Sequence, residues 1–206
     1  RQACLESGID LVTANTKVVG RGAADKLFIN TSGFGLVSLT NPPSAHRAEP
    51  GDVIMINGDI GRHGIAIMAA REGLDLETTI VSDTAPLRNV VHALLKIDPD
   101  IHCVGDLTRG GLSSSLNEIA QASNVGISID EACIPIHPEV QAVCELLGFD
   151  PLYVACEGRF ISIVKSQTAE KLLDHMKSFC SESDPRVIGQ VVADHPKKVV
   201  MRSRVG

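Results

Sequence analysis

A stretch with several chemically active side chains runs from position 103 to 120 and reads CVGDLTRGGLSSSLNEIA. An acid, a hydroxyl, a cation and two glycines stand directly before a helical pattern, namely Asp106, Thr108, Arg109, Gly110 and Gly111. The first turn of a helix has unpaired N–H groups and partial positive charge, and glycines let a ligand approach the backbone. An arginine adds a bidentate donor for phosphate or carboxylate. The stretch therefore predicts a helix start that binds an anion.

The carboxylate of Asp106 would repel a phosphate unless a cation lay between them. Mg²⁺ meets this need because carboxylate and phosphate oxygens share it readily, so Asp106 is a candidate metal ligand. An alternative interpretation makes Thr108 the helix cap, the two glycines turn residues and Arg109 one half of a solvent-exposed ion pair. The GxxxxGK[ST] spacing of a P-loop is absent.

A second glycine-rich helix start occurs in NGDIGRHGIAIMAA, where Arg62 and His63 follow Asp59. Capping of the helix by Asp59 explains this pattern as well as ligand binding does. In ACEGRF, the pattern favours a tight turn with a solvated carboxylate at Glu157. Lys17 lies in or beside an expected strand, where a lysine usually faces solvent.

The composition of the 206-residue chain narrows the classes of function. The formal net charge is -6, aromatic residues make up 3% and there is no Trp, which argues against a nucleic-acid binder. No apolar run reaches the ~18 residues that span a bilayer, and no signal segment opens the chain. Six cysteines without a CxxC pair indicate reduced thiols in a cytoplasmic protein.

Strand and helix patterns mix along the chain, which predicts an α+β or α/β domain. Strands are expected over 9–14, 25–39, 52–57, 101–104, 125–130, 159–164 and 186–193, and helices over 61–73, 86–97, 108–123, 138–148 and 168–180. Asp83 and Thr84 are possible caps of the helix that opens at Pro86. The proline-rich stretch NPPSAHRAEPGD predicts a domain boundary near residue 50.

Seven segments appear in an order and spacing that resemble the HypE family of hydrogenase maturation proteins. They are TKVVGRG, FINTSGFG, PGDVIMINGDIGRHGIAIMAAREGL, SDTAPL, DIHCVGDLTRGGLSSSLNEIA, GISIDEACIPI and LGFDPLYVACEGR. The family lies in the superfamily of aminoimidazole ribonucleotide (AIR) synthetase and selenophosphate synthetase. The resemblance implies a PurM-like α+β fold. Residues 1–49 would be the remainder of an N-terminal ATP-binding and dimerisation domain, and 50–206 a C-terminal AIR-synthase-like domain.

The resemblance also implies a function in the maturation of [NiFe]-hydrogenase. A C-terminal S-carbamoyl-cysteine, loaded by the carbamoyltransferase HypF, is dehydrated with ATP and Mg²⁺ to a thiocyanate. The cyanide then passes to iron on the HypC–HypD complex, and the full-length protein is a cytoplasmic homodimer that needs neither nucleic acid nor membrane. Alternatives are another ATP-dependent synthetase of the superfamily, such as a selenophosphate synthetase, or a non-catalytic docking module for maturation partners.

Matching the family motifs residue by residue implies roles for several side chains. Lys17 would lie near the reacting carbamoyl group or phosphate. Glu118, which lies off the apolar stripe of its helix, is a candidate base, although a solvated carboxylate explains it too. The segment from Asp106 to Gly111 would face nucleotide phosphate or Mg²⁺, and Arg62 and His63 would contact nucleotide or substrate.

Three departures from the family pattern bear on activity. The family's TGDTKVV reads TANTKVV here, with Ala14 and Asn15, and Cys156 stands where the family has Asn. The last cysteine is Cys180, and the PRIC-like tail of the family is absent. We therefore expect this polypeptide to be a fragment that is inactive on its own.

Overall fold

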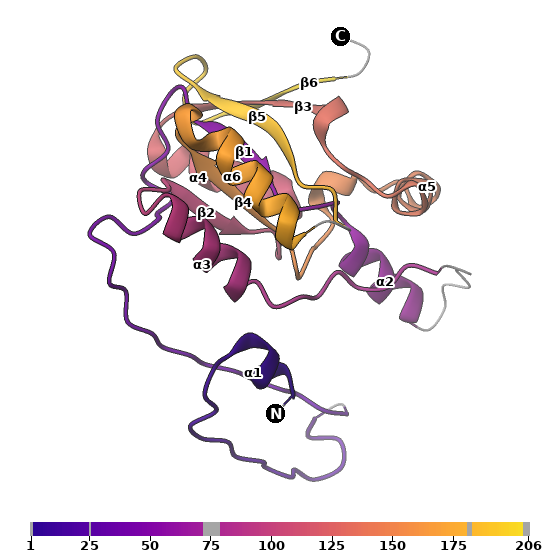
Figure 1. Cartoon of the computed structure of the whole chain (residues 1–206). Coiled ribbons are helices and arrows are strands. Elements are labelled where there is room, and N and C mark those ends of the chain that lie inside the picture. The colour runs from indigo at the N-terminus through magenta and orange to yellow at the C-terminus, as the bar shows by residue number, and fades with distance from the viewer. Residues whose placement is uncertain (1, 25, 72–78, 181–182, 204–206) are drawn as a thin grey trace.

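The fold is built on one mixed sheet of six strands, seen in the computed structural model of residues 2–24, 26–71, 79–180 and 183–203 (Figure 1). The strands are β1 (Val53–Ile56), β2 (Cys103–Asp106), β3 (Gly126–Asp130), β4 (Phe160–Val164), β5 (Arg186–Val192) and β6 (Val199–Arg202). Their order is β2-β4-β1-β5-β3-β6, and only β3 and β6 pair in parallel. The α+β prediction is thereby confirmed.

Helices cover both faces of the sheet. The described helices are α1 (Gln2–Ser7), α2 (Arg62–Ala70), α3 (Arg88–Ile97), α4 (Gly111–Ser123), α5 (Pro138–Leu147) and α6 (Ser166–Phe179), with short 3-10 turns η1 (Glu131–Cys133) and η2 (Pro151–Tyr153). The helices α3 and α6 lie on one face and α4 lies on the other (Figure 1). Within the described residues, no helix combines the length and apolarity needed to cross a membrane.

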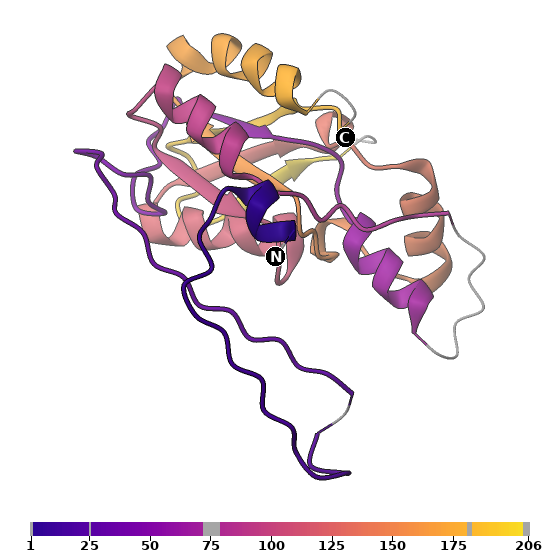
Figure 2. The same ribbon diagram turned by 60° about the horizontal axis from the view of Figure 1, so that its bottom comes forward.

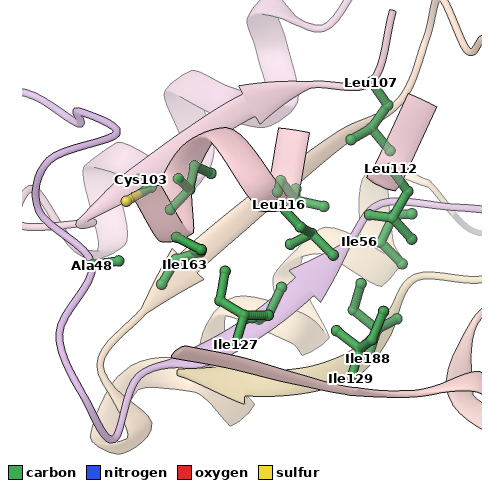
Figure 3. Close-up of a cluster of buried hydrophobic side chains, with 14 of the residues drawn as sticks. Ala48, Ile56, Cys103, Leu107, Leu112, Leu116, Ile127, Ile129, Ile163 and Ile188 are labelled. Carbon is green, nitrogen blue, oxygen red and sulfur yellow. The ribbon is translucent and has the colours of Figure 1, made fainter. Parts of the chain in front are cut away.

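The main core lies between α4 and the sheet (Figure 3). The predicted apolar stripe of α4 is confirmed, because Leu112, Leu116 and Ile119 are all buried there. They pack in one cluster with strand residues such as Ile127 and Ile163. This packing fixes the end of β2 relative to the start of α4, and those two ends carry the glycine-rich stretch.

The central strand β4 is buried along its whole length, since helices cover it on both sides. Ile161 and Ile163 face the α4 core, while Phe160 and Val164 face the core formed with α3 and α6. A strand covered on both faces is expected to be mostly apolar, and four of the five residues of FISIV are apolar, with the polar Ser162 buried among them.

The predicted strands over 9–14 and 25–39 are wrong for every described residue in those ranges. The chain there forms no strand, and large apolar side chains such as Phe34 and Leu36 are almost fully exposed. Both views show this segment running away from the sheet (Figures 1 and 2). A strand needs a partner for its backbone N–H and C=O groups, and the described chain offers none at this place.

Two further sequence expectations fail locally. The helix after Pro86 begins at Arg88 with Leu87 at its N-cap position, so neither Asp83 nor Thr84 caps it. The strand β6 was not predicted, although it pairs with β3 over four residues. The other predicted elements are present, with ends that differ by at most three residues in the described chain.

Candidate functional site

A cavity of about 200 Å³ opens between the end of β2 and the first turns of α4. Its lining residues are Ala45, Val104, Gly105, Asp106, Thr108, Arg109, Ser115, Glu118 and Ile119. Four of the predicted site residues therefore share one cavity. Asp106 ends β2, Thr108 and Arg109 lie in the connecting turn, and Glu118 comes two turns into α4.

The structure contradicts two parts of the alternative interpretation, namely the Thr108 cap and the Arg109 ion pair. Gly110, not Thr108, is the N-cap of α4, and no side chain in the described part of the chain caps that helix. The Thr108 hydroxyl instead donates to Asp106 Oδ2 at 3.3 Å. Arg109 is exposed and makes no ion pair with any described residue. The guanidinium is therefore available to an anion in the cavity.

The two glycines have a structural reason of their own. Gly110 and Gly111 have φ angles of 76° and 59°, which L residues with side chains rarely adopt. A Cβ on Gly111 would lie 2.6 Å from the Leu152 carbonyl oxygen and 2.8 Å from that of Val154. The glycines thus let the start of α4 pack against the backbone around η2, and their contact with a phosphate stays a prediction.

Ser115 is a cavity residue that the sequence analysis missed. It lies three residues before Glu118 on α4, so both side chains share one face of the helix. A Cβ on Gly105 would come within 2.9 Å of Ser115 Oγ, so the absence of a side chain at Gly105 leaves room for this hydroxyl. The spacing of three was the signal available in the sequence.

The donor set of the cavity suits Mg²⁺ held jointly with phosphate. Asp106 and Glu118 supply two exposed carboxylates, and Thr108 and Ser115 supply hydroxyl oxygens. No group of three or more His, Cys, Asp or Glu side chains that could hold a metal occurs in the described part of the chain. Mg²⁺ typically binds through one or two carboxylates plus substrate phosphates, so the residues fit this ion.

The second glycine-rich start is organised around a buried carboxylate. Asp59 Oδ1 accepts a hydrogen bond from Arg159 at 2.8 Å, and Asp59 Oδ2 accepts one from Arg62. The N-cap of α2 is Gly61, so Asp59 does not cap this helix. Arg62 lines a different cavity from that of Asp106, one it shares with His137 and Arg186. The structure therefore does not bring Arg62 to the α4 start.

His63 belongs to a third group of side chains. Its Nδ1 lies 2.8 Å from Ser82 Oγ, and its Nε2 lies 3.9 Å from Glu157 Oε1. His63 also lines an apolar groove of about 370 Å³ together with Phe149 and Tyr153. Glu157 lies in a bend of the chain and its carboxylate is exposed, as the pattern favoured, although an imidazole also lies beside it. An imidazole beside a carboxylate is an arrangement that can accept and return a proton.

Lys17 lines neither the cavity of Asp106 nor the cavities that contain Arg62 and His63. It lies in the extended N-terminal segment, is exposed, and makes no hydrogen bond or ion pair with a described residue. Its predicted position near the reacting group stays a prediction.

Cys156, one of the departures from the family pattern, is an internal thiol. It is fully buried, and its sulfur accepts a hydrogen bond from the Gly61 N–H at 3.2 Å. Burial raises the pKa of Cys156 to about 12, with a further contribution from the nearby Asp83 charge. The thiolate is the reactive form, so Cys156 is not a nucleophile at neutral pH.

Comparisons with known proteins place these features in a family. Residues 49–202 match the family described as AIR synthase related protein, C-terminal domain. The carbamoyl dehydratase HypE of Azotobacter vinelandii is 44% identical over 208 residues, which is 99% of this chain and 60% of that protein. The chain thus spans about three fifths of the length of this curated relative.

Solved structures of HypE proteins also resemble this chain. The hydrogenase maturation protein HypE in complex with ATP superposes with a TM-score of 0.93 at 41% identity, covering 100% of this chain and 63% of that one. The HypE–HypF complex gives a TM-score of 0.93 at 40% identity, with 100% of this chain and 67% of that chain covered. The predicted AIR-synthase-like fold and the resemblance to HypE are therefore confirmed.

Proposed function

This chain belongs to the AIR synthase related protein family, and on that premise we propose that it is part of an ATP-dependent carbamoyl dehydratase of [NiFe]-hydrogenase maturation. The observation that carries the proposal is the cavity that gathers Asp106, Thr108, Arg109 and Glu118 at the start of α4. An exposed guanidinium, two carboxylates and a helix start in one cavity suit a Mg²⁺-bound nucleotide phosphate. The similarity to a HypE structure that contains ATP supports this assignment.

The reaction needs phosphate because an amide oxygen is a poor leaving group. In the proposed reaction, the carbonyl oxygen of an S-carbamoyl-cysteine attacks the γ-phosphorus of ATP, and ADP leaves. Removal of the two N–H protons then forms the carbon–nitrogen triple bond as phosphate departs. The products are a thiocyanate, ADP and phosphate, and the thiocyanate is the source of the cyanide ligands of the hydrogenase iron.

The residues of this chain divide between binding and proton transfer. Arg109 would donate to the phosphate oxygens, and Asp106 would hold the Mg²⁺, which neutralises phosphate charge when bound. Two groups offer a base: Glu118 inside the cavity, and Glu157 beside His63. Lys17 would approach the reacting group from the N-terminal segment. The glycines of the α4 start would contact the nucleotide, and Arg62 and His63, which line two other cavities, would contact substrate.

The reaction would need a first domain that completes the ATP site, and partner proteins that supply the carbamoyl group and accept the cyanide. Residues 1–49 would belong to a first domain that contributes to ATP binding and to a homodimer, and residues 50–206 would form a second domain. A HypF-type carbamoyltransferase would load the thiol, and a HypC–HypD complex would take the cyanide in the cytoplasm. The HypE–HypF complex among the similar structures supports the first of these partners.

A hybrid protein tests this function. The chain would replace the matching 60% of the Azotobacter vinelandii relative, and mass spectrometry would follow a synthetic S-carbamoyl-cysteine peptide. We expect the hybrid, with ATP and Mg²⁺, to remove one water from the peptide, and we expect Asp106→Asn to abolish this. The chain alone should leave the peptide unchanged. A hybrid that consumes ATP without water loss, while the relative converts the peptide, would overturn the proposal.

A further inference from the structure

Asp83 is a buried carboxylate without an assigned role, in a connection that lies before α3. Its Oδ1 accepts two backbone hydrogen bonds, from Glu157 N at 2.7 Å and from Gly158 N at 3.2 Å. Its Oδ2 is buried and has no hydrogen-bond partner among the described residues. A buried carboxylate with an unpaired oxygen costs stability, so the contacts of Oδ1 must account for its presence. Those contacts all go to one turn.

The backbone around Asp83 and this turn fit tightly together. A Cβ on Gly158 would lie 1.9 Å from the Asp83 carbonyl oxygen and 2.8 Å from the Ala85 nitrogen. Only a glycine at position 158 allows this approach. The 83–85 segment and the 157–158 turn are thus held in a single arrangement by hydrogen bonds and by shape.

The same short segment, residues 82–84, also contacts His63, which lies beside Glu157. Ser82, the neighbour of Asp83, bonds His63 Nδ1 at 2.8 Å, and the Ser82 and Thr84 hydroxyls lie 2.7 Å apart. Three consecutive residues therefore fix the backbone of Glu157 and the ring of His63. The start of α2, which carries His63, is tied to the residue after the turn through the buried Asp59–Arg159 pair.

We propose that Asp83 is a positioning residue that holds the Glu157 carboxylate beside His63 for proton transfer. The proposal rests on the proposed function, because that reaction needs a base and the His63–Glu157 pair would supply one. Proton transfer requires heavy atoms within about 2.6–3.2 Å of the reacting group, and such distances often shorten only when substrate binds. A carboxylate that is already oriented at 3.9 Å from Nε2 needs little movement to reach that geometry.

Other charges lie near His63 and must be considered in any test. Arg71 and Asp150 line the same groove, and Arg62, the neighbour of His63 in α2, is paired with Asp59. None of them is hydrogen-bonded to Asp83 in the described structure, so substitution of Asp83 leaves these contacts in place.

The test is nuclear magnetic resonance of the 206-residue chain, with the ring nitrogen and Cε1–H signals of His63 as the readout. We expect Asp83→Ala to move the His63 signals in the same direction as Glu157→Ala does, because both remove the carboxylate from Nε2. Asp83→Asn retains an oxygen acceptor for the two amides, so it should keep the wild-type His63 signals. The remaining six of the seven histidines report whether the fold is intact.

Calorimetry with MgATP separates this proposal from the proposed function. The α4 cavity is lined by neither Asp83 nor Glu157, so Asp83→Ala should leave the Kd for MgATP within about twofold of the wild-type value. Absence of MgATP binding by the wild-type chain would count against the proposed function and leave the His63 readout valid. Unchanged His63 signals in Asp83→Ala, or Asp83→Asn behaving like Asp83→Ala, would overturn the positioning role.

Discussion

The buried pair of Asp59 and Arg159 gives the sharpest stability prediction. Both side chains are less than a tenth exposed, and Arg159 donates to the Asp59 carboxylate at 2.8 Å and to the Asp59 carbonyl oxygen at 2.8 Å. Replacement of Asp59 by Ala leaves the guanidinium of Arg159 buried without its counter-charge. Removing one partner of a buried ion pair typically costs about 3–5 kcal/mol, which is a large part of the stability of an ordinary domain.

Arg62, the more exposed partner of Asp59, supplies a matched control. Arg62 also bonds the Asp59 carboxylate, but 28% of its side chain is exposed. Arg62→Ala should therefore cost only about 0–1 kcal/mol. The double variant Asp59→Ala/Arg159→Met should recover part of the loss, because no unpaired charge then remains buried.

Urea unfolding followed by circular dichroism measures these differences. At a slope of about 2–3 kcal/mol per M, Asp59→Ala should lower the midpoint by about 1–2.5 M, and Arg62→Ala by at most about 0.5 M. Equal midpoints for Asp59→Ala and Arg62→Ala would refute the reasoning. So would a double variant that is less stable than Asp59→Ala alone, since the buried charge would then not be the cause.

Three further predictions concern other parts of the chain. Gly111→Ala should lower the free energy of unfolding by about 2–4 kcal/mol, measured by urea unfolding, because it combines a positive φ with contacts to backbone oxygens near η2. A hydrogen bond from Lys165 is the main reason why the pKa of Asp100 falls from 3.8 to about 2, so Asp100→Asn should destabilise the chain at neutral pH. That difference should vanish as the pH falls from about 4 to about 2, which thermal unfolding across this range would show. Burial raises the pKa of Cys103 and Cys156 to about 12, so iodoacetamide should label neither thiol before unfolding, as peptide mass spectrometry would reveal.

Local patterns in the sequence predicted the α4 region well. The stripe of apolar residues on α4 placed Leu112 and Leu116 in the core and left Glu118 off the stripe, and the structure has Glu118 exposed at the cavity. The end of β2 and the start of α4 are neighbours in sequence and in space. Their side chains therefore share a cavity without help from distant segments.

Such local patterns do not predict contacts between residues that are far apart in the sequence. Its position before Pro86 makes Asp83 a possible helix cap, whereas in the structure it accepts a hydrogen bond from the backbone of Glu157, 74 residues away. Helix capping is one of two interpretations of Asp59 from its pattern, and in the structure Asp59 instead pairs with Arg159 across 100 residues. Caps and tight turns use the same residue types, so sequence alone does not separate a local from a distant acceptor.

In the N-terminal segment, the sequence pattern predicts strands that the structure does not contain among the described residues. Residues such as Leu27, Phe28 and Ile29 have the composition of a strand, and a pattern of apolar residues predicts a strand wherever it occurs. All three are exposed, because no other described strand pairs with this segment. The short strand β6 was missed because its four residues lack an alternating pattern, and it forms through its pairing with β3.

Calorimetry of MgATP binding tests the central claim, that the cavity at the start of α4 holds a Mg²⁺-bound nucleotide phosphate. The account predicts that the chain binds ATP only with Mg²⁺, and more weakly than the longer Azotobacter vinelandii relative. Arg109→Ala should weaken ATP binding about tenfold, and Asp106→Asn should remove its dependence on Mg²⁺. The control is Arg71→Ala, in the groove that His63 lines, which should change neither the affinity for ATP nor the Mg²⁺ dependence. Binding that is unaffected by Asp106→Asn and Arg109→Ala, or no binding by the chain at all, would contradict it.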